Sequence, residues 1–260
     1  MEYAVVCLVA LVASGLTLFS GFGLGTLLLP AFALFFPIST AVALTAVVHL
    51  ANNLFKLGLV GPRADRRLVV RFGLPGLVFA FVGALLLGHL AELPPLAEYG
   101  VGGRTHQVRP IGVVVGALMV VLAMMEVLPR FERMSVPPAW LPLGGALSGF
   151  IGGISGLQGA LRSAFLLRFK EALSKESFIA TNVVISVLVD LARLAIYGTT
   201  FSWSSADENL PLVAAATLSA FIGAYLGARL MRKITMRAVQ RTVAAMLVLL
   251  GTGVALGFLG

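Results

Sequence analysis

The feature that constrains this chain most is a succession of long apolar segments joined by short polar links. These segments cover residues 3–19, 40–60, 72–90, 111–128, 174–197, 212–231 and 242–258. Hydrophobic residues make up 59% of the 260 residues, and charged residues make up only 12%. A soluble domain of this size does not need so much apolar surface, whereas apolar helices of about 20 residues span a bilayer. The sequence therefore predicts an all-α polytopic membrane protein.

Other features of the composition exclude several classes of protein. The single cysteine, Cys7, rules out disulfide bonds within the chain and cysteine-based metal clusters. The net charge is +8, but the basic residues lie in short links, where they orient a membrane protein rather than bind nucleic acid. We expect neither a cofactor nor a nucleic-acid partner. Glu2 precedes the first apolar segment, so we do not interpret that segment as a cleaved signal peptide.

One apolar stretch, residues 145–173, is interrupted by a glycine-rich break at residues 152–156. Gln158, Arg162 and Ser163 follow the break directly, in a segment that is otherwise membrane-like. The break predicts the end of one helical piece and the start of another. We expect a re-entrant hairpin here, because irregular backbone at membrane depth is tolerated where it lines a polar cavity.

A weaker copy of this pattern lies near the N-terminus, in residues 20–39. Gly23 and Gly25 belong to its break, Thr26 adds a hydroxyl group, and Pro30 stiffens or kinks the arm that follows. No charged residue occurs in this copy. We expect the tips of the two hairpins to form the two sides of one binding site.

The two halves of the chain also resemble each other. Two short motifs recur: Ser20-Gly21-Phe22 as Ser148-Gly149-Phe150, and Phe81-Val82-Gly83-Ala84 as Phe221-Ile222-Gly223-Ala224. We therefore predict a first repeat over residues 1–130 and a second over residues 139–260. Each repeat is expected to be a re-entrant broken-helix hairpin followed by three transmembrane helices. The alternative is chance similarity between glycine-rich apolar sequences.

The distribution of lysine and arginine predicts how the repeats are oriented. If both hairpins re-enter, one side of the membrane receives Arg63, Arg66, Arg67, Arg71, Arg130, Arg133, Arg168, Lys170, Lys175, Arg229, Arg232, Lys233, Arg237 and Arg241. Only Arg104 and Arg109 then fall on the other side. The positive-inside rule favours this arrangement over one in which both hairpins cross. Each half then crosses three times, so the repeats are inverted and both termini lie outside.

Arg162 is the strongest candidate for contact with a ligand. A cation at membrane depth costs about 2.5–3.5 kcal/mol even on insertion scales, so such a residue is rarely without a role. Arg162 follows the break, where the free N–H groups of a helix N-terminus carry partial positive charge. A guanidinium group beside a helix N-terminus is suited to an oxyanion. The alternatives are that Arg162 reaches the cytoplasmic interface or pairs with Glu126.

Further polar residues and glycines complete the predicted binding site. The candidate substrate-binding residues are Arg162, Gln158, Ser163, Ser155, Gly156, Gly23, Gly25, Thr26, Asn53, His49 and Asn182. The glycines could instead serve only the tip geometry or close helix packing. His49 could be an ordinary core histidine. Asp190 and Arg193 are expected to pair on one helix, as a structural pair more than as a proton relay.

An enzyme hypothesis rests on Gly153-Ile154-Ser155-Gly156, which matches the GxSG pattern of intramembrane serine proteases. A serine nucleophile needs a base to accept its proton. His49, His89 and His106 all precede Ser155, whereas those proteases place the base downstream. We therefore expect no enzymatic activity from Ser155, and a passive anion channel is the main alternative to a carrier.

A family resemblance is carried by GALSGFIGGISGLQGALRSAFLLR and the following LSKESFIATNVVISVLVDLARLAIY. These stretches resemble the second half of the TauE/SafE sulfite exporter family, also called the toluene sulfonate uptake permease family. The N-terminal GFGLGTLLLPAFALF is similar to the glycine-rich first repeat of that family, with its following proline. Many members carry a proline in the second hairpin as well. Here Arg162 and Ser163 stand near that position, which indicates a distinct branch.

The resemblance implies a secondary transporter of small sulfur-containing anions, such as sulfite, thiosulfate or organosulfonates. Export across the cytoplasmic (inner) membrane is the expected direction. The residues themselves indicate an anion, and only the resemblance adds sulfur. The expected partners are the anionic substrate and the lipid bilayer, and the pattern is compatible with proton coupling and with a homodimer.

Overall fold

The computed structural model describes residues 1–20, 24–127, 137–166, 169, 173–200, 204–230 and 236–259. The long elements of the first half are α1 (Glu2–Ser20), α2 (Leu24–Ala33), α3 (Ile38–Val60), α5 (Leu74–Glu92) and α6 (Pro110–Val127). Those of the second half are α8 (Leu141–Ser155), α9 (Gln158–Leu166), α10 (Lys175–Thr200), α11 (Ser204–Leu230) and α12 (Met236–Ala255). Short helical turns are η1 (Gly61–Arg63), α4 (Arg66–Leu68), η2 (Val69–Gly73) and η3 (Pro138–Trp140). The two strands are β1 (Ala97–Val101) and β2 (Arg104–Val108).

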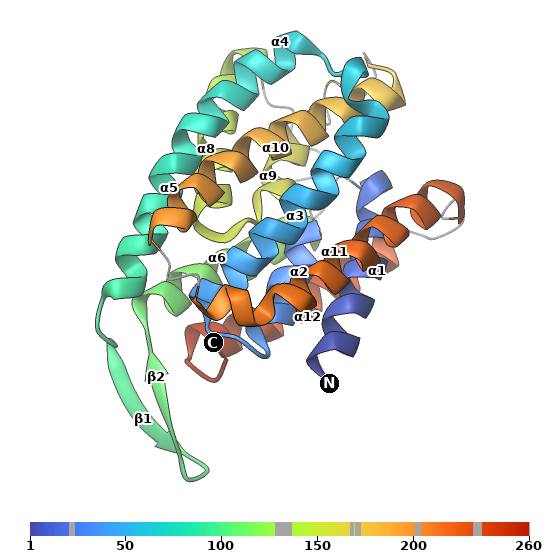
Figure 1. The fold of residues 1–260 in the computed structure, drawn as a ribbon. Helices are drawn as coiled ribbons and strands as arrows, with labels where there is room; N and C mark the ends of the chain where they lie inside the picture. The colour runs from blue at the N-terminus through green and yellow to red at the C-terminus, as the bar shows by residue number, and fades with distance from the viewer. Residues whose placement is uncertain are drawn as a thin grey trace.

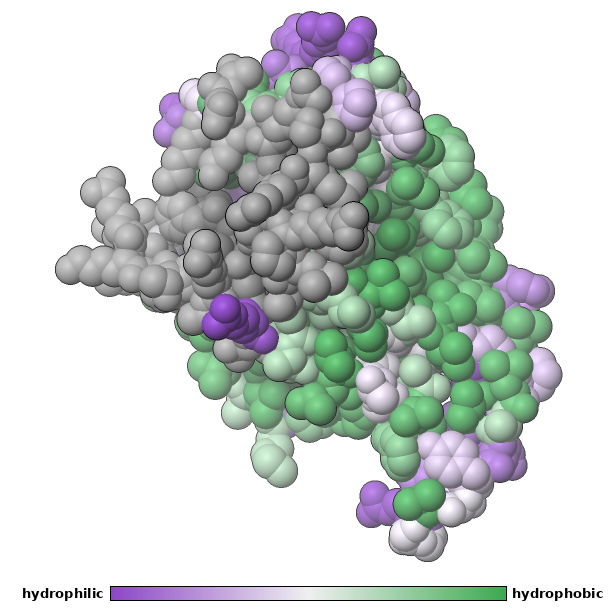
Figure 2. Space-filling view, turned by 180° about the vertical axis from the view of Figure 1, so that it is seen from behind, coloured by the Kyte–Doolittle hydropathy of each residue, from purple (hydrophilic) through white to green (hydrophobic). Residues whose placement is uncertain are grey.

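The helices meet the requirements of a membrane protein. Among the described residues, four helical spans are long and apolar enough to cross a bilayer: Ile38–Gly58, Arg66–Glu92, Glu176–Thr200 and Asn209–Gly227. Large apolar side chains on these spans, such as Leu85, Leu191 and Leu218, are exposed. Figure 2 shows a broad apolar surface between hydrophilic groups at the top and the bottom of the molecule. The predicted all-α polytopic membrane fold is therefore confirmed.

Both predicted hairpins are present as helix pairs, α1–α2 and α8–α9. Gly156 ends α8 in the left-handed conformation, with φ +75°, and donates its N–H to the carbonyl of Gly152. Glycine adopts this conformation without steric cost, so the chain turns sharply before α9 begins at Gln158. In the first hairpin α2 begins at Leu24, and residues 21–23, which include the candidate Gly23, lie outside the described part.

Helices of one half pack against helices of the other half. The pairs are α1 with α11, α8 with α5, α3 with α10, and α6 with α12. Figure 1 shows α3 and α10 side by side through the middle of the molecule. The counterparts in the two halves are α1 and α8, α3 and α10, α5 and α11, and α6 and α12. If each helix is exchanged with its counterpart, the same four pairs result, as expected for a two-fold repeat. The inversion of the halves and their boundaries at residues 130 and 139 stay predictions.

The recurring Phe-x-Gly-Ala motif marks equivalent contacts in the two halves. A Cβ on Gly83 of α5 would collide with the carbonyl oxygen of Phe150 on α8. A Cβ on Gly223 of α11 would collide with the carbonyl oxygen of Leu11 on α1. In each case a glycine allows two backbones to approach closely, as small residues do in membrane helix pairs.

The two copies of the Ser-Gly-Phe motif begin at different distances from the ends of their helices. Ser20 is the last residue of α1, whereas Ser148 lies about two turns before the end of α8. Ser14, which precedes Gly15, lies at a comparable distance from the end of α1, and it is buried like Ser148. Gly21 and Phe22 of the first copy lie outside the described residues, so the register read from this motif stays a prediction.

The link between α5 and α6 contains a β-hairpin, which the apolar pattern did not predict. β1 and β2 pair antiparallel, and Gly102 and Gly103 turn the chain with φ +61° and +76°. Two successive positive φ values are typical of a two-residue hairpin turn. Tyr99 donates a hydrogen bond to the carbonyl of Leu256 after α12 (2.5 Å). The hairpin therefore rests on the C-terminal end of the second half (Figure 1).

Candidate functional site

The buried polar side chains of the described residues lie on α1, α2 and α3 of the first half and on α8, α9 and α10 of the second. They are Ser14, Thr26, Thr45, His49, Asn52, Asn53, Lys56, Ser148, Ser155, Gln158, Arg162, Thr181, Asn182, Ser186, Asp190 and Arg193. Burying polar and charged groups in an apolar helical protein costs free energy unless they are bonded to one another or used. These residues, which we call the central polar cluster, are therefore the main candidates for a functional site.

The tips of the two hairpins meet at this cluster. Gly25, in the first turn of α2, lies so close to the second hairpin that a Cβ on it would stand 3.0 Å from the carbonyl oxygen of Gly156. Gly156 in turn lies against the guanidinium group of Arg193 on α10. Both helix N-termini, that of α2 at Leu24 and that of α9 at Gln158, start within two residues of this contact. The structure thus brings together the predicted tip residues Gly25 and Gly156 beside a buried cation.

Arg193 offers a hydrogen-bond donor at the tips. Its Nε and Nη2 atoms donate to Oδ1 of Asp190 at 3.0 and 2.8 Å, which confirms the expected pair. Its Nη1 atom, on the side of Gly156, has no acceptor among the described residues, and the side chain is fully buried. Buried donors are nearly always bonded, so such an atom needs an explanation.

Gln158 is the second unusual group at the tips. Its side chain is 1% exposed, and neither its amide nitrogen nor its amide oxygen has a partner among the described residues. The residue itself is held in place, because Ser148 of α8 donates a hydrogen bond to its backbone carbonyl (3.2 Å). Thr45 Oγ1 and Asn52 Nδ2 on α3 are likewise buried without a described partner. These groups and Arg193 could bind a small polar ligand.

Arg162 is buried inside the protein and does not extend to its surface. It is 4% exposed, its Nε donates to Oδ1 of Asn182 (3.0 Å), and its Nη1 donates to Oγ of Ser186 (2.6 Å). Asn182 is itself fixed by a bond to the carbonyl of Phe178 (2.9 Å). Arg162 therefore joins α9 to α10 inside the protein. The side chain of Glu126, its alternative partner, lies outside the described part.

The other predicted residues are distributed around this centre. Ser155 Oγ donates to the carbonyl of Ile151 (3.0 Å) and accepts from the N–H of Leu157 (3.3 Å), so it caps the break. Thr26 is buried on α2, and Ser163 is partly buried on α9.

His49 and Asn53 lie on α3 and face the second half. His49 Nδ1 stands 2.7 Å from Oδ2 of Asp190, and Asn53 Nδ2 donates to the same oxygen at 3.1 Å. His49 Nδ1 and Asn53 Nδ2 are also 3.1 Å apart. Asp190 is thus bonded from α3 and from Arg193 of its own helix. The structure joins the candidate His49 to the Asp190–Arg193 pair, which the sequence treated separately.

A shared spacing in the two central helices could have indicated Arg193. Thr45, His49, Asn53 and Lys56 of α3 are spaced like Asn182, Ser186, Asp190 and Arg193 of α10. Steps of four, four and three residues place each set on one face of its helix. The two helices pack against each other, and His49 and Asn53 of one face bond Asp190 of the other. Comparing the helices in this register would have added Arg193 to the predicted site.

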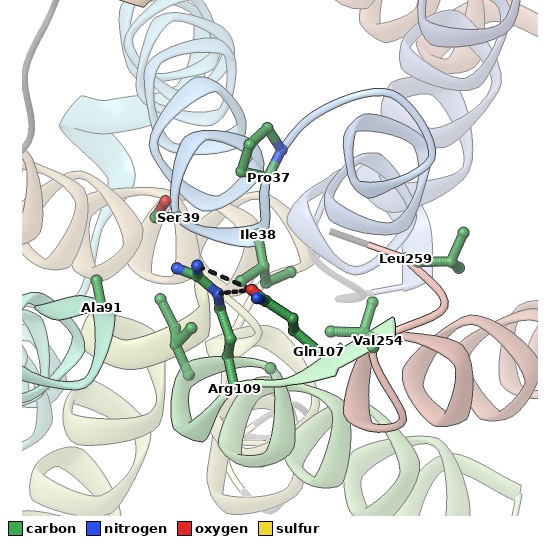
Figure 3. Close-up of a pocket in the computed structure, with 11 residues that line it drawn as sticks. Pro37, Ile38, Ser39, Ala91, Gln107, Arg109, Val254 and Leu259 are labelled. Atoms are coloured by element: carbon green, nitrogen blue, oxygen red, sulfur yellow. Dashed lines mark hydrogen bonds between the residues drawn. The ribbon is translucent and has the colours of Figure 1, made fainter. Parts of the chain in front are cut away.

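A second polar region lies at the end of α3 that is far from Lys56. A cavity of about 300 Å³ is lined by the first residues of α3 and α6, by β2 and by the end of α12. Figure 3 shows Arg109 reaching into it, with its Nε and Nη2 atoms bonded to Oε1 of Gln107 at 3.4 and 3.1 Å. Arg109 is exposed, unlike the buried arginines. This cavity opens on the side where Arg104 and Arg109 were predicted to lie outside the membrane.

The comparisons with known proteins agree with the fold. Residues 6–254 match the family model described as sulfite exporter TauE/SafE. No curated protein matches the chain significantly. Because the family match extends over nearly the whole chain, the protein belongs to the TauE/SafE sulfite exporter family, a family of membrane transporters.

Proposed function

We propose that this protein is a secondary transporter that exports small sulfur-containing anions, with the anion held between the tips of the two hairpins. One observation carries the proposal: Gly25 and Gly156 meet beside Arg193, whose Nη1 has no acceptor among the described residues. The side chain of Gln158 adds an unbonded amide two residues further on. Sulfite, thiosulfate and small organosulfonates are the substrates considered.

The chemistry of these groups favours an anion over a cation or a neutral solute. The N-termini of α2 and α9 carry free N–H groups and partial positive charge. Arg193 adds a guanidinium nitrogen, and charge-assisted hydrogen bonds to oxyanions are about twice as strong as neutral ones. A sulfur oxyanion has several acceptor oxygens and fits such a set of donors. The family supplies the sulfur, which the geometry by itself does not select.

Arg162 is given a supporting part in this proposal. Its positive charge adds to the potential at the tips, and its bonds to Asn182 and Ser186 keep α9 in place. Ser163, Thr26 and the first-hairpin glycines would complete the walls around the anion.

Alternating access would follow from the relation between the halves. The two tips belong to different repeats, and the contact between them is made by glycine and backbone atoms. Rocking one half against the other would open the anion to one side of the membrane and close it to the other. In the cytoplasmic membrane the potential favours outward movement of an anion by about 2.3 kcal/mol per charge per 100 mV.

The test is uptake of labelled sulfite, thiosulfate and a panel of small sulfonates into proteoliposomes at equal, verified incorporation. We expect saturable uptake and trans-stimulation by the wild type, and a loss of at least about tenfold for Gln158→Leu and Arg193→Gln. Gly58→Ala on α3 is the matched control, because a Cβ there meets nothing within 4 Å.

Three outcomes would contradict the proposal. Wild-type protein that moves none of these anions would remove the substrate class. A linear, non-saturating conductance would identify a channel instead of a carrier. Normal transport by Gln158→Leu, which removes the amide and adds no charge, would place the binding site elsewhere.

A further inference from the structure

The central polar cluster contains a histidine–carboxylate pair that anion binding alone does not use. His49 Nδ1 and Asp190 Oδ2 are 2.7 Å apart, and their side chains are 3% and 0% exposed. Within the described part of the chain, Asp190 is the only buried acidic residue. The other buried ionisable side chains described are Lys56 on α3, Arg162 on α9, and Arg193 and Tyr197 on α10.

We propose that the His49–Asp190 pair is a proton-binding site, and that Arg193 couples its protonation to binding of the anion. The protein would then carry a proton together with each anion. A dianion such as thiosulfate would still move one net negative charge, which the membrane potential favours outward, whereas a monovalent sulfonate would move without net charge. This inference rests on the proposed function, because it needs an anion at the hairpin tips.

The first argument is the position of the pair between the two halves. His49 lies on α3 and Asp190 on α10, 141 residues apart in the sequence. A movement of one half against the other therefore changes the surroundings of both groups at once. A proton bound from water on one side can then be released to water on the other side, which a proton-coupled carrier requires.

The second argument is the double use of Arg193. Two of its nitrogen atoms, Nε and Nη2, donate to Asp190, while Nη1 lies at Gly156, where the anion is proposed to bind. Asp190 and the anion therefore compete for one positive charge in a buried place, where electrostatic interactions are strong. A proton added to His49 or Asp190 reduces the negative charge that competes with the anion. Proton and anion should consequently bind together and not in exchange for one another.

The third argument is that the donors of Asp190 come from both halves. Asn53 Nδ2 and His49 Nδ1 approach Oδ2, and Arg193 holds Oδ1. If α3 moves away from α10, Oδ2 loses its partners while Oδ1 keeps its own. Because a buried carboxylate that loses its donors favours its protonated form, the movement and the proton are linked.

The test uses the whole protein in proteoliposomes that contain a pH-sensitive dye. The membrane potential is clamped with valinomycin and equal potassium on both sides. Thiosulfate and a sulfonate stay ionised near neutral pH, so a proton that enters with them is carried by the protein. We expect internal acidification during anion uptake. A gradient of one pH unit, acid outside, should give about tenfold accumulation of the anion if one proton accompanies each anion.

Two variants separate proton coupling from anion binding. His49→Gln keeps a side chain that can donate to Asp190 but cannot take up the proton. The described contacts of His49 are to Asp190 and Asn53, and none is to the hairpin tips. We therefore expect the variant to retain anion exchange between two equal pools and to lose acidification and gradient-driven accumulation. His89→Gln makes the same chemical change on an exposed position of α5 and should behave as the wild type. Retained exchange shows that the variant is folded.

The outcomes distinguish the two proposals. If the wild type moves no anion, the proposed function itself fails. If it moves the anion without acidification, or with alkalinisation inside, the coupling inference is overturned while the transport function stands. Acidification that persists both in His49→Gln and in Asp190→Asn, each with anion exchange retained, would overturn the assignment of the proton to this pair.

Discussion

The first hairpin, α1–α2, and the second hairpin, α8–α9, meet at Gly25 and Gly156 but bring different side chains to the contact. α2 is buried along nearly its whole length, and Thr26 is its only polar residue. α9 carries Gln158 and Arg162, both buried. The two arms therefore have a similar place in the fold and a different chemistry.

The difference extends to the helices behind the hairpins. In the second half Arg162 bonds Asn182 and Ser186 of α10. The matching positions of α3 are Thr45 and His49, but α2 offers no cation to them. Thr45 Oγ1 consequently has no partner among the described residues, and His49 reaches across to the other half.

We infer a division of roles from this comparison. The second hairpin is fastened to its own half and presents the polar groups, so it would bind the anion. The first hairpin contributes backbone and close packing, so it would close the site. The polar face of α3 is left to interact with the second half.

The largest effect is expected from Gly156→Ala, which changes the turn at the tip of the second hairpin. Alanine at φ +75° costs about 1–3 kcal/mol, and its Cβ would collide with the guanidinium group of Arg193. We expect anion uptake to fall by more than about tenfold. Gly25→Ala is the matched change in the first tip. Gly25 has an ordinary helical conformation, and a Cβ on it would stand 3.0 Å from the carbonyl oxygen of Gly156. It should reduce uptake only a few-fold. Equal losses in both variants would show that the two tips have the same role.

An intermediate effect is expected from Arg162→Gln, which releases the second hairpin from α10. Hydrogen bonds from a charged group contribute about 1.5–3 kcal/mol each, so both thermal stability and uptake should fall. A supporting role predicts a lower maximal rate at a nearly unchanged KM, whereas direct contact predicts a higher KM. Uptake kinetics together with a thermal unfolding curve check this. Wild-type stability and uptake would show that Arg162 does not fasten α9.

The smallest effect is expected from Thr45→Val, compared with Asn182→Leu at the matching position of α10. Thr45 Oγ1 has no described partner, so replacing it with a methyl group should change stability by no more than about 0.5 kcal/mol. Asn182→Leu leaves Nε of Arg162 without its acceptor and should cost about 1.5–3 kcal/mol. Thermal unfolding in detergent measures both. A large loss in Thr45→Val would mean that the two halves use these positions alike.

Much of the fold could be predicted because its signals are local. The apolar segment at residues 40–60 became α3, which spans Ile38–Val60, and the glycine break at residues 152–156 ends α8 at Ser155. The β-hairpin after α5 was missed, although Gly102 and Gly103 mark its turn. Its strands are short and exposed, so the sequence lacks the apolar alternation that would predict them.

The candidate site could be predicted only in part. Gly25, Gly156 and Gln158 were expected at the tips, and the structure places them there. Arg193 was assigned to a pair with Asp190 and not to the tips, because the sequence does not show which helix faces a hairpin. Whether these residues bind an anion stays a prediction.

The membrane class, the helical segments and the positions of the breaks could be read from the amino-acid sequence. These follow from the length of apolar runs and from glycine, which act on neighbouring residues. The contacts of His49 with Asp190 and of Arg193 with Gly156 result from tertiary packing, which no local pattern encodes. Such contacts depend on how α3, α10 and the hairpins pack across the two halves, and the close approach of their backbones is set by the whole bundle and by no single segment.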